Sequence, residues 1–139
     1  MNVDAGLRLH LVNDQAVAAL VQPASIVCGG DLPEAATYPA IICAMPNSIP
    51  QVTLGGPTGL NETGIELEVL APDSESANAL DRARQIAAAV VAALHGWRGT
   101  WGDQEVQGVF LEAQADLERD EETQLAGVSL EFTVWHSRA

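Results

Sequence analysis

The sequence predicts an α+β domain in which a largely antiparallel mixed sheet of about four to five strands carries two helices on one face. Apolar residues recur at helical spacing in two segments, and they alternate with polar residues in several others. The predicted elements follow the order helix, strands, helix, strands. With 139 residues, of which 47% are hydrophobic, the chain is expected to form a single domain, 1–139, with its own core.

The first half of the chain predicts one helix and then several strands. Residues 4–22 have helical spacing, interrupted near Asn13-Asp14, and Pro23 marks the end of the helix. Residues 26–28 form a short apolar run, which Gly29-Gly30-Asp31 ends in a turn before a polar connector, 32–38.

The next two segments predict a hairpin. Residues 40–45 form an apolar strand that Pro46-Asn47 interrupts and that 49–54 continue, and the glycine-rich tip is 55–59. Residues 62–70 follow as a strand in which Glu66 and Glu68 alternate with apolar residues, so one face is expected to be buried and the other wet.

A second helix is predicted up to Leu94, with Asp73 or Ser74 as its N-cap and Gly96 just after its end. From Ile86 to Leu94 this helix has no polar side chain on any side. Either a partner covers its outer face, or alanine, a good helix former, is simply tolerated at the surface. The sequence favours neither explanation.

The last part of the chain predicts a hairpin. A glycine-rich loop, 97–104, leads into a strand, 105–117, and a charged turn joins it to a final strand, 125–136. In the first strand one face is expected to hold the residues Val109, Leu111, Ala113, Ala115 and Leu117.

The charge of the chain restricts its partners. Asp and Glu number 19 against 6 basic residues, all arginines, and the net charge is −13. Such a chain is unsuited to direct binding of nucleic acid or of anionic membranes, which require cations.

No apolar run is long enough for a membrane span, and the first seven residues do not resemble a signal peptide, so synthesis in the cytoplasm is expected. In that reducing compartment Cys28 and Cys43 are expected to be buried thiols and not a disulfide.

The sequence contains no convincing catalytic, cofactor or metal site. His10, His95 and His136 lack metal-ligand spacing, and each is expected at the surface or at a helix end. The 55–59 segment lacks the ending of a phosphate-binding loop and no helix follows it. The carboxylates of 118–122 do not have the spacing of a calcium loop, which favours a solvated turn.

Two tryptophans flank an arginine in the 97–104 loop. Tryptophan and arginine are enriched at binding hot spots, so Trp97, Arg98 and Trp101 could form a contact surface. Equally, both rings could fold back over the sheet edge as part of the core. Taken alone, the residues indicate an acidic α+β domain that works by contact.

The order of segments resembles the tail-terminator, or tail-completion, family of long-tailed phages and prophages. The resemblance runs through nearly the whole chain and is carried by Asp14-Gln15-Ala16-Val17, Leu20-Val21, Leu32-Pro33, Tyr38-Pro39-Ala40-Ile41-Ile42, Glu66-Leu67-Glu68-Val69-Leu70-Ala71, Ala79-Leu80, Ala83, Ile86, Val90, Ala93-Leu94 and Val128-Ser129-Leu130-Glu131-Phe132-Thr133-Val134. The family usually has an arginine and an aromatic residue around the first short strand, and Ser25-Ile26-Val27-Cys28 departs from that pattern.

The resemblance implies a structural virion protein and not an enzyme. Such proteins are made in the host bacterial cytoplasm and form a ring, commonly a hexamer, on the head-proximal end of the tail. The ring stops polymerisation of the tail tube protein and offers a joining surface to the head-tail connector, or neck, proteins. DNA passes through without specific binding, and no cofactor, metal or membrane is involved.

A closed ring requires two different complementary surfaces on each subunit. The expected subunit or tube contacts are Ile86, Val90, Leu94, Trp97, Arg98, Trp101, Leu54 and Leu60. A wall of carboxylates would keep DNA from adhering to the lumen, and the expected residues are Glu118, Asp120, Glu121 and Glu122. The alternatives are another phage neck protein, such as a head-closure or connector component, and an acidic cytosolic adaptor that binds a basic partner.

Overall fold

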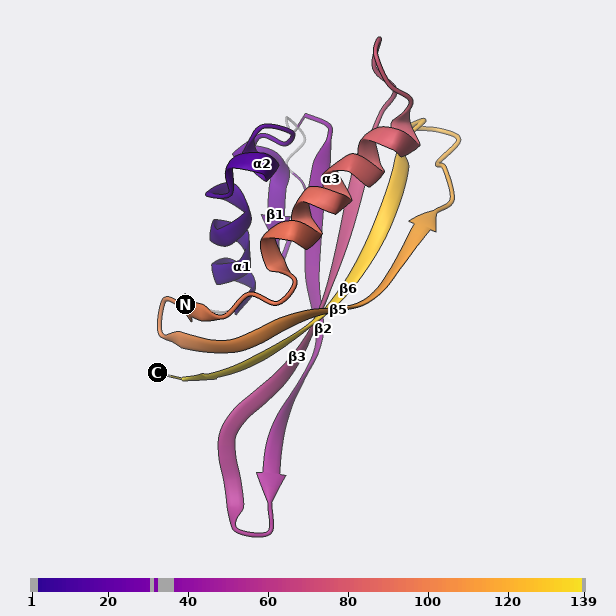
Figure 1. Ribbon diagram of the computed structural model, residues 1–139. Coiled ribbons are helices and arrows are strands. Elements are labelled where there is room, and N and C mark those ends of the chain that lie inside the picture. Colours follow the sequence, from indigo (N-terminus) through magenta and orange to yellow (C-terminus); the bar gives the residue numbers. More distant parts are fainter. Residues whose placement is uncertain (1–2, 31, 33–36, 139) are drawn as a thin grey trace.

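The computed structural model describes residues 3–30, 32 and 37–138, and it confirms the α+β class. A curled sheet carries the helices on one face and leaves the other face open (Figure 1). The sheet has six strands in the order β1-β2-β3-β6-β5-β4, which is more than the four to five expected. Among the described strands, only β1 and β2 run parallel, and every other neighbouring pair is antiparallel.

The predicted N-terminal helix is broken where the sequence indicates. Helix α1 (Val3–Val12) ends before Asn13, and the short α2 (Gln15–Ala18) starts after Asp14. The carboxylate of Asp14 accepts hydrogen bonds from the backbone N–H of Ala16 and Val17, both at 3.1 Å, and so caps α2. A 3₁₀ turn, η1 (Pro23–Ser25), then leads into β1 (Ile26–Cys28).

The longest hairpin of the fold joins β2 (Ala40–Thr53) and β3 (Gly56–Ala71). Both strands extend further than predicted, because pairing continues almost to the tip at Thr53↔Gly56. The alternation expected in 62–70 is confirmed, since Ile65, Leu67 and Val69 are buried. The connector 32–38 lies mostly outside the described residues.

Helix α3 (Ala79–Leu94) begins later than the sequence indicates. The N-cap residue is Asn78, whose side chain accepts a hydrogen bond of 2.8 Å from the N–H of Asp81. Asp73 lies outside the N-cap position, but its carboxylate accepts a hydrogen bond of 2.7 Å from the N–H of Ala79, the first residue of the helix. Ser74 is held in a preceding turn, in which its backbone N–H donates to the carbonyl of Ala77. The end is as predicted, with Gly96 at a φ of 80°.

The predicted loop 97–104 contains a short strand, β4 (Gly99–Trp101), which pairs with the start of β5 (Gln104–Leu117). The sequence did not predict this strand, because three residues, the first of them a glycine, carry no alternation pattern. Strand β5 forms the expected hairpin with β6 (Ala126–Arg138).

The predicted face of β5 is wrong beyond Leu111. A bulge between Leu111 and Ala113 shifts the register, so that Leu111 lies opposite Phe132 while Ala113 lies opposite Glu131. Paired residues share a face, so Ala113, Ala115 and Leu117 are on the open side of the sheet. The alternate residue Asp116 faces the helices and forms an ion pair with Arg84 of α3.

The core lies between the sheet and the helices. Its largest fully buried side chains are Leu7, Leu11, Val17, Ile26, Ile41, Ile65, Leu67, Val69, Val90, Leu94, Leu130 and Phe132. None of the described helices is long and apolar enough to cross a membrane.

The expectation of two free thiols is wrong, because the structure joins Cys28 and Cys43 in a disulfide. Parallel pairing of β1 with β2 places the two residues directly opposite each other, with their Cα atoms 4.5 Å apart. That separation lies within the range that a disulfide spans. The sequence spacing alone did not reveal this register.

Candidate functional site: contact surfaces of the subunit

The outer part of the β2–β3 hairpin, residues 44–61, forms an arm that projects beyond the rest of the sheet (Figure 1). Pairing of β3 with β6 stops at Leu60↔Ser137, so the arm beyond this pair is a two-stranded ribbon. No residue from 44 to 61 is charged, although the chain as a whole has a net charge of −13. An isolated ribbon of this kind is only marginally stable in water.

Large apolar side chains are exposed along the arm. Val52 is 66% exposed, and Leu54, at the tip, is fully exposed. Ile49 is also exposed, while Leu60, at the base, is half-buried. The sequence had indicated Leu54 and Leu60 as contact residues, and the structure places them at opposite ends of the same arm.

Two prolines make the outer edge of β2 a poor partner for another strand. Pro46 and Pro50 have no N–H to donate, and the ladder between β2 and β3 is irregular beside each of them. A protein that binds the arm would therefore contact its side chains and would not extend the sheet.

The tryptophan loop folds back on the helical layer. Trp97 and Trp101 stack with ring centroids 5.1 Å apart, and Trp97 also lies 4.6 Å from the ring of His10 on α1. The Trp101 indole N–H donates to Nδ1 of His10 at 3.4 Å, which leaves Nε2–H to donate to the carbonyl of Ala93 at 2.9 Å. Trp101 is thus a core residue, whereas Trp97 is half-buried and Arg98 between them is exposed.

The three helix residues expected at a contact surface belong to the core of the subunit. Ile86, Val90 and Leu94 are at most 2% exposed, because this stripe of α3 faces the sheet. The outer surface of the same half of α3 is formed by other residues, among them the exposed Ala88 and Ala92.

The four acidic residues expected at a lumen, Glu118, Asp120, Glu121 and Glu122, are all exposed. They lie in the β5–β6 turn, at the end of the sheet opposite the tip of the arm (Figure 1). Asp120 organises the turn by accepting hydrogen bonds from the N–H groups of Thr123 and Glu122, which lower the pKa of its carboxyl. Arg119, in the same turn, pairs with Asp73 at 2.8 Å and thereby lowers the pKa of Asp73.

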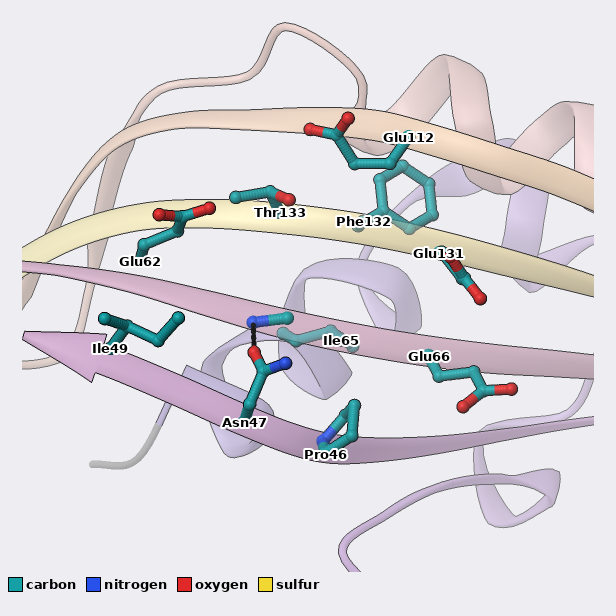
Figure 2. Close-up of a pocket in the computed structure, with 11 residues that line it drawn as sticks. Pro46, Asn47, Ile49, Glu62, Ile65, Glu66, Glu112, Glu131, Phe132 and Thr133 are labelled. Carbon is teal, nitrogen blue, oxygen red and sulfur yellow. Dashed lines mark hydrogen bonds between the residues drawn. The ribbon is translucent and has the colours of Figure 1, made fainter.

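A hollow that no sequence pattern indicated lies on the open face of the sheet, at the base of the arm. It has a volume of about 420 Å³. Its lining side chains, drawn in Figure 2, include Glu62, Glu66, Glu112 and Glu131. Gly64 contributes no side chain to the floor, and its N–H donates to Oδ1 of Asn47 at 3.1 Å.

Three strands bring these carboxylates together. Glu66 of β3 lies directly opposite Glu131 of β6, and the bulge in β5 places Glu112 beside them. Alternation in 62–70 predicts a wet face for Glu66, but only strand order and the bulge reveal its acidic neighbours. Among the described residues, no group of three His, Cys, Asp or Glu is placed to hold a metal ion.

His136 is buried, contrary to the expected surface position, at 7% exposure. Its Nε2 lies 2.6 Å from the hydroxyl oxygen of Thr63 and its Nδ1 lies 2.9 Å from the amide oxygen of Gln104. Burial lowers the pKa of this imidazole, which favours the neutral form. The arrangement is structural, because it ties β3, β5 and β6 together beneath the base of the arm.

The fold resembles a chain of a solved particle described as "Virion of native gene transfer agent (GTA) particle". The two chains are 20% identical, the match covers 97% of this chain and 94% of the other, and the TM-score is 0.70. No curated protein matches the sequence.

The sequence itself matches a protein family over residues 5–137, which includes the arm, the hollow and the acidic turn. The description of that family is "Tail completion protein gp17". The family is one of structural tail completion proteins. The chain therefore belongs to the tail completion protein gp17 family.

Proposed function

We propose that the chain forms a ring, most simply a hexamer, on the head-proximal end of the tail tube. The ring stops polymerisation of the tail tube protein and offers its other side to the head-tail connector proteins. Membership of the tail completion family supports this role. The observation that carries it is the uncharged arm, which exposes Ile49, Val52 and Leu54 on an otherwise strongly acidic subunit.

The arm is suited to a protein surface and not to water. Residues 44–61 contain no charge. Beyond the pair Leu60↔Ser137, the two strands of the arm pair only with each other. Burial of Val52 and Leu54 on a partner would contribute about 1.5–3 kcal/mol for each side chain that becomes fully covered. We infer that the arm contacts the last ring of the tube or the neighbouring subunit.

The acidic turn suits the lumen of such a ring. Glu118, Asp120, Glu121 and Glu122 are exposed, and a carboxylate wall would repel DNA phosphates as the genome passes. Replacing all four with lysine should slow DNA ejection from assembled particles, because the wall would then attract the phosphates. An unchanged ejection rate would count against a lumen position for this turn.

The arm is tested by a double substitution, Val52→Asp with Leu54→Asp. Both side chains are exposed, so the subunit should keep its stability while losing its ring and its binding to tubes. Light scattering over a concentration series, with and without tail tubes, gives the mass in each case. Ser76→Asp, which adds a charge to an exposed loop away from the arm, is the control.

The wild-type protein and the control should form a ring of about six subunits, either alone or on tubes. An arm variant that still forms the ring and binds tubes would remove the arm from the contact. A wild-type protein that ignores tubes but binds a portal complex would instead indicate a neck protein of another kind.

A further inference from the structure

We propose that Arg98 of one subunit inserts into the acidic hollow of the next subunit and pairs with Glu66, Glu112 and Glu131. This contact would close the ring, and the proposal therefore rests on the proposed function. The hollow thus takes a guanidinium group of a second copy of this chain. Three observations support this contact. Arg98 has no partner among the described residues of its own subunit, the glutamates of the hollow lie on neighbouring strands without a cation, and the two surfaces are different parts of the subunit.

Arg98 is the cation that the subunit leaves free. In the described part of the chain, Arg84, Arg119 and Arg138 lie against carboxylates, and Arg8 and Arg82 donate to backbone carbonyls. Arg98 alone has no hydrogen bond or ion pair there, and its side chain is exposed. The chain contains no lysine, so among the described residues Arg98 is the basic side chain that has neither a hydrogen bond nor an ion pair.

The carboxylates of the hollow lack a cation within their own subunit. Glu66 and Glu131 are cross-strand neighbours, and like charges in that arrangement destabilise a sheet. Figure 2 shows Glu66, Glu112 and Glu131 on three neighbouring strands around one hollow. None of the three forms an ion pair with a described residue of its own subunit. A planar guanidinium, with several N–H donors, can bind more than one of these carboxylates at once.

The two surfaces are different parts of the subunit, as a head-to-tail ring requires. Arg98 follows Trp97, whose backbone pairs with Val109 at the outer edge of β5, and precedes β4 at the end of the sheet. The hollow lies on the open face of the sheet and is lined by residues of β2, β3, β6 and β5, whereas Arg98 lies beyond the free edge of β5. A head-to-tail ring joins two different patches of each subunit, and these patches are complementary in charge.

The stacked tryptophans hold the arginine in place. Trp97 packs against both His10 and Trp101, so the backbone that carries Arg98 is anchored on the helical layer. A fixed position reduces the conformational freedom that the side chain loses on binding. DNA is a poor alternative occupant of the hollow, because its phosphates would meet four glutamates.

The absence of lysine allows a direct test. In Arg98→Lys the introduced amine is the only side-chain amine of the chain, and a zero-length carbodiimide can join it to a carboxylate in contact. The variant is assembled into rings, on tail tubes if tubes are required, then cross-linked and mapped by peptide mass spectrometry. Mixed isotopic labelling of subunits distinguishes links between subunits from links within one.

Links between subunits from position 98 to Glu66, Glu112 or Glu131 would support the proposal. Links to any other carboxylate of this chain, links to the tail tube protein, or no link in assembled rings would overturn it. The wild-type protein treated in the same way controls for links made by the N-terminal amine.

A charge exchange provides a second, independent readout. Arg98→Glu and Glu131→Arg should each raise the protein concentration needed for half-assembly by at least about tenfold, since each places like charges in contact. Combining the two substitutions should restore most of the loss. Glu75→Arg, which makes the same change in the exposed loop before α3, is the matched control and should leave ring assembly unchanged.

The exchange separates this proposal from the proposed function. If wild-type subunits form rings on tubes but Arg98→Glu does so equally well, the contact is wrong and the ring stands. If wild-type subunits form no ring and bind no tube, the proposed function fails and this contact with it.

Discussion

Val90→Asp distinguishes a core role of α3 from a contact role. The Val90 side chain is fully buried between α3 and the sheet, within the subunit. The substitution removes a buried side chain worth about 1.5–3 kcal/mol and adds an unpaired carboxylate, whose burial costs several kcal/mol more. A sum of about 5 kcal/mol or more approaches the whole stability of an ordinary domain, which is about 5–15 kcal/mol. We therefore expect Val90→Asp to unfold the subunit or to leave it barely stable.

Ala88→Asp is the matched control on the outer surface of the same helix. Ala88 is exposed, so the free energy of unfolding should fall by less than about 1 kcal/mol, mainly through the lower helix propensity of aspartate. Urea denaturation followed by circular dichroism measures both variants. If Val90→Asp unfolds at the same urea concentration as the wild type, the packing of α3 against the sheet is not as described.

Two further predictions concern the interior. Because the pKa of His136 is lowered in the folded state, the unfolded chain takes up a proton at this residue before the folded chain does as the pH falls below about 6.5. The contribution of His136 to the free energy of unfolding is therefore complete above that pH and is lost as the pH falls. Urea denaturation at about pH 7.5 and pH 5 should therefore show a smaller acid loss in His136→Gln than in the wild type, and equal losses would refute the assignment. At Gly6 an added Cβ would lie 2.5 Å from Cβ of Trp101, so Gly6→Ala should cost about 1–3 kcal/mol, whereas Gly30→Ala, with open space around it, should be close to neutral in the same assay.

Local patterns predicted most elements of the fold. The break at Asp14, the alternation in 62–70 and the C-terminal hairpin depend on neighbouring residues only, and all three are confirmed. The apolar stripe of α3 was also predicted, but the sequence does not show whether these side chains pack against the sheet of the same subunit or against a partner. It meets the sheet of its own subunit, which removes Val90 from any contact surface.

Features that depend on pairing between distant strands could not be predicted. The bulge after Leu111 reverses the faces of β5, and no residue type marks it. The disulfide depends on Cys28 lying opposite Cys43, and the acidic hollow depends on Glu66 lying opposite Glu131. In each case the relevant neighbour is distant in the sequence, so the chemistry appears only once the strand order is known.

The uncharged arm lies between these two cases. The hairpin was predicted from the sequence. The absence of charge indicates a contact surface only once the structure places the ribbon beyond the end of β6. Exposure of Val52 and Leu54 follows from that position and not from their residue types.

Arrest of tube growth tests the central claim most directly. Purified tail tube protein is polymerised with and without this chain, and tube lengths and tube ends are measured by electron microscopy over time. We expect tubes that stop lengthening when the chain is added and that carry a ring of about six subunits at one end. Tubes that continue to grow at the same rate with bare ends would contradict the account.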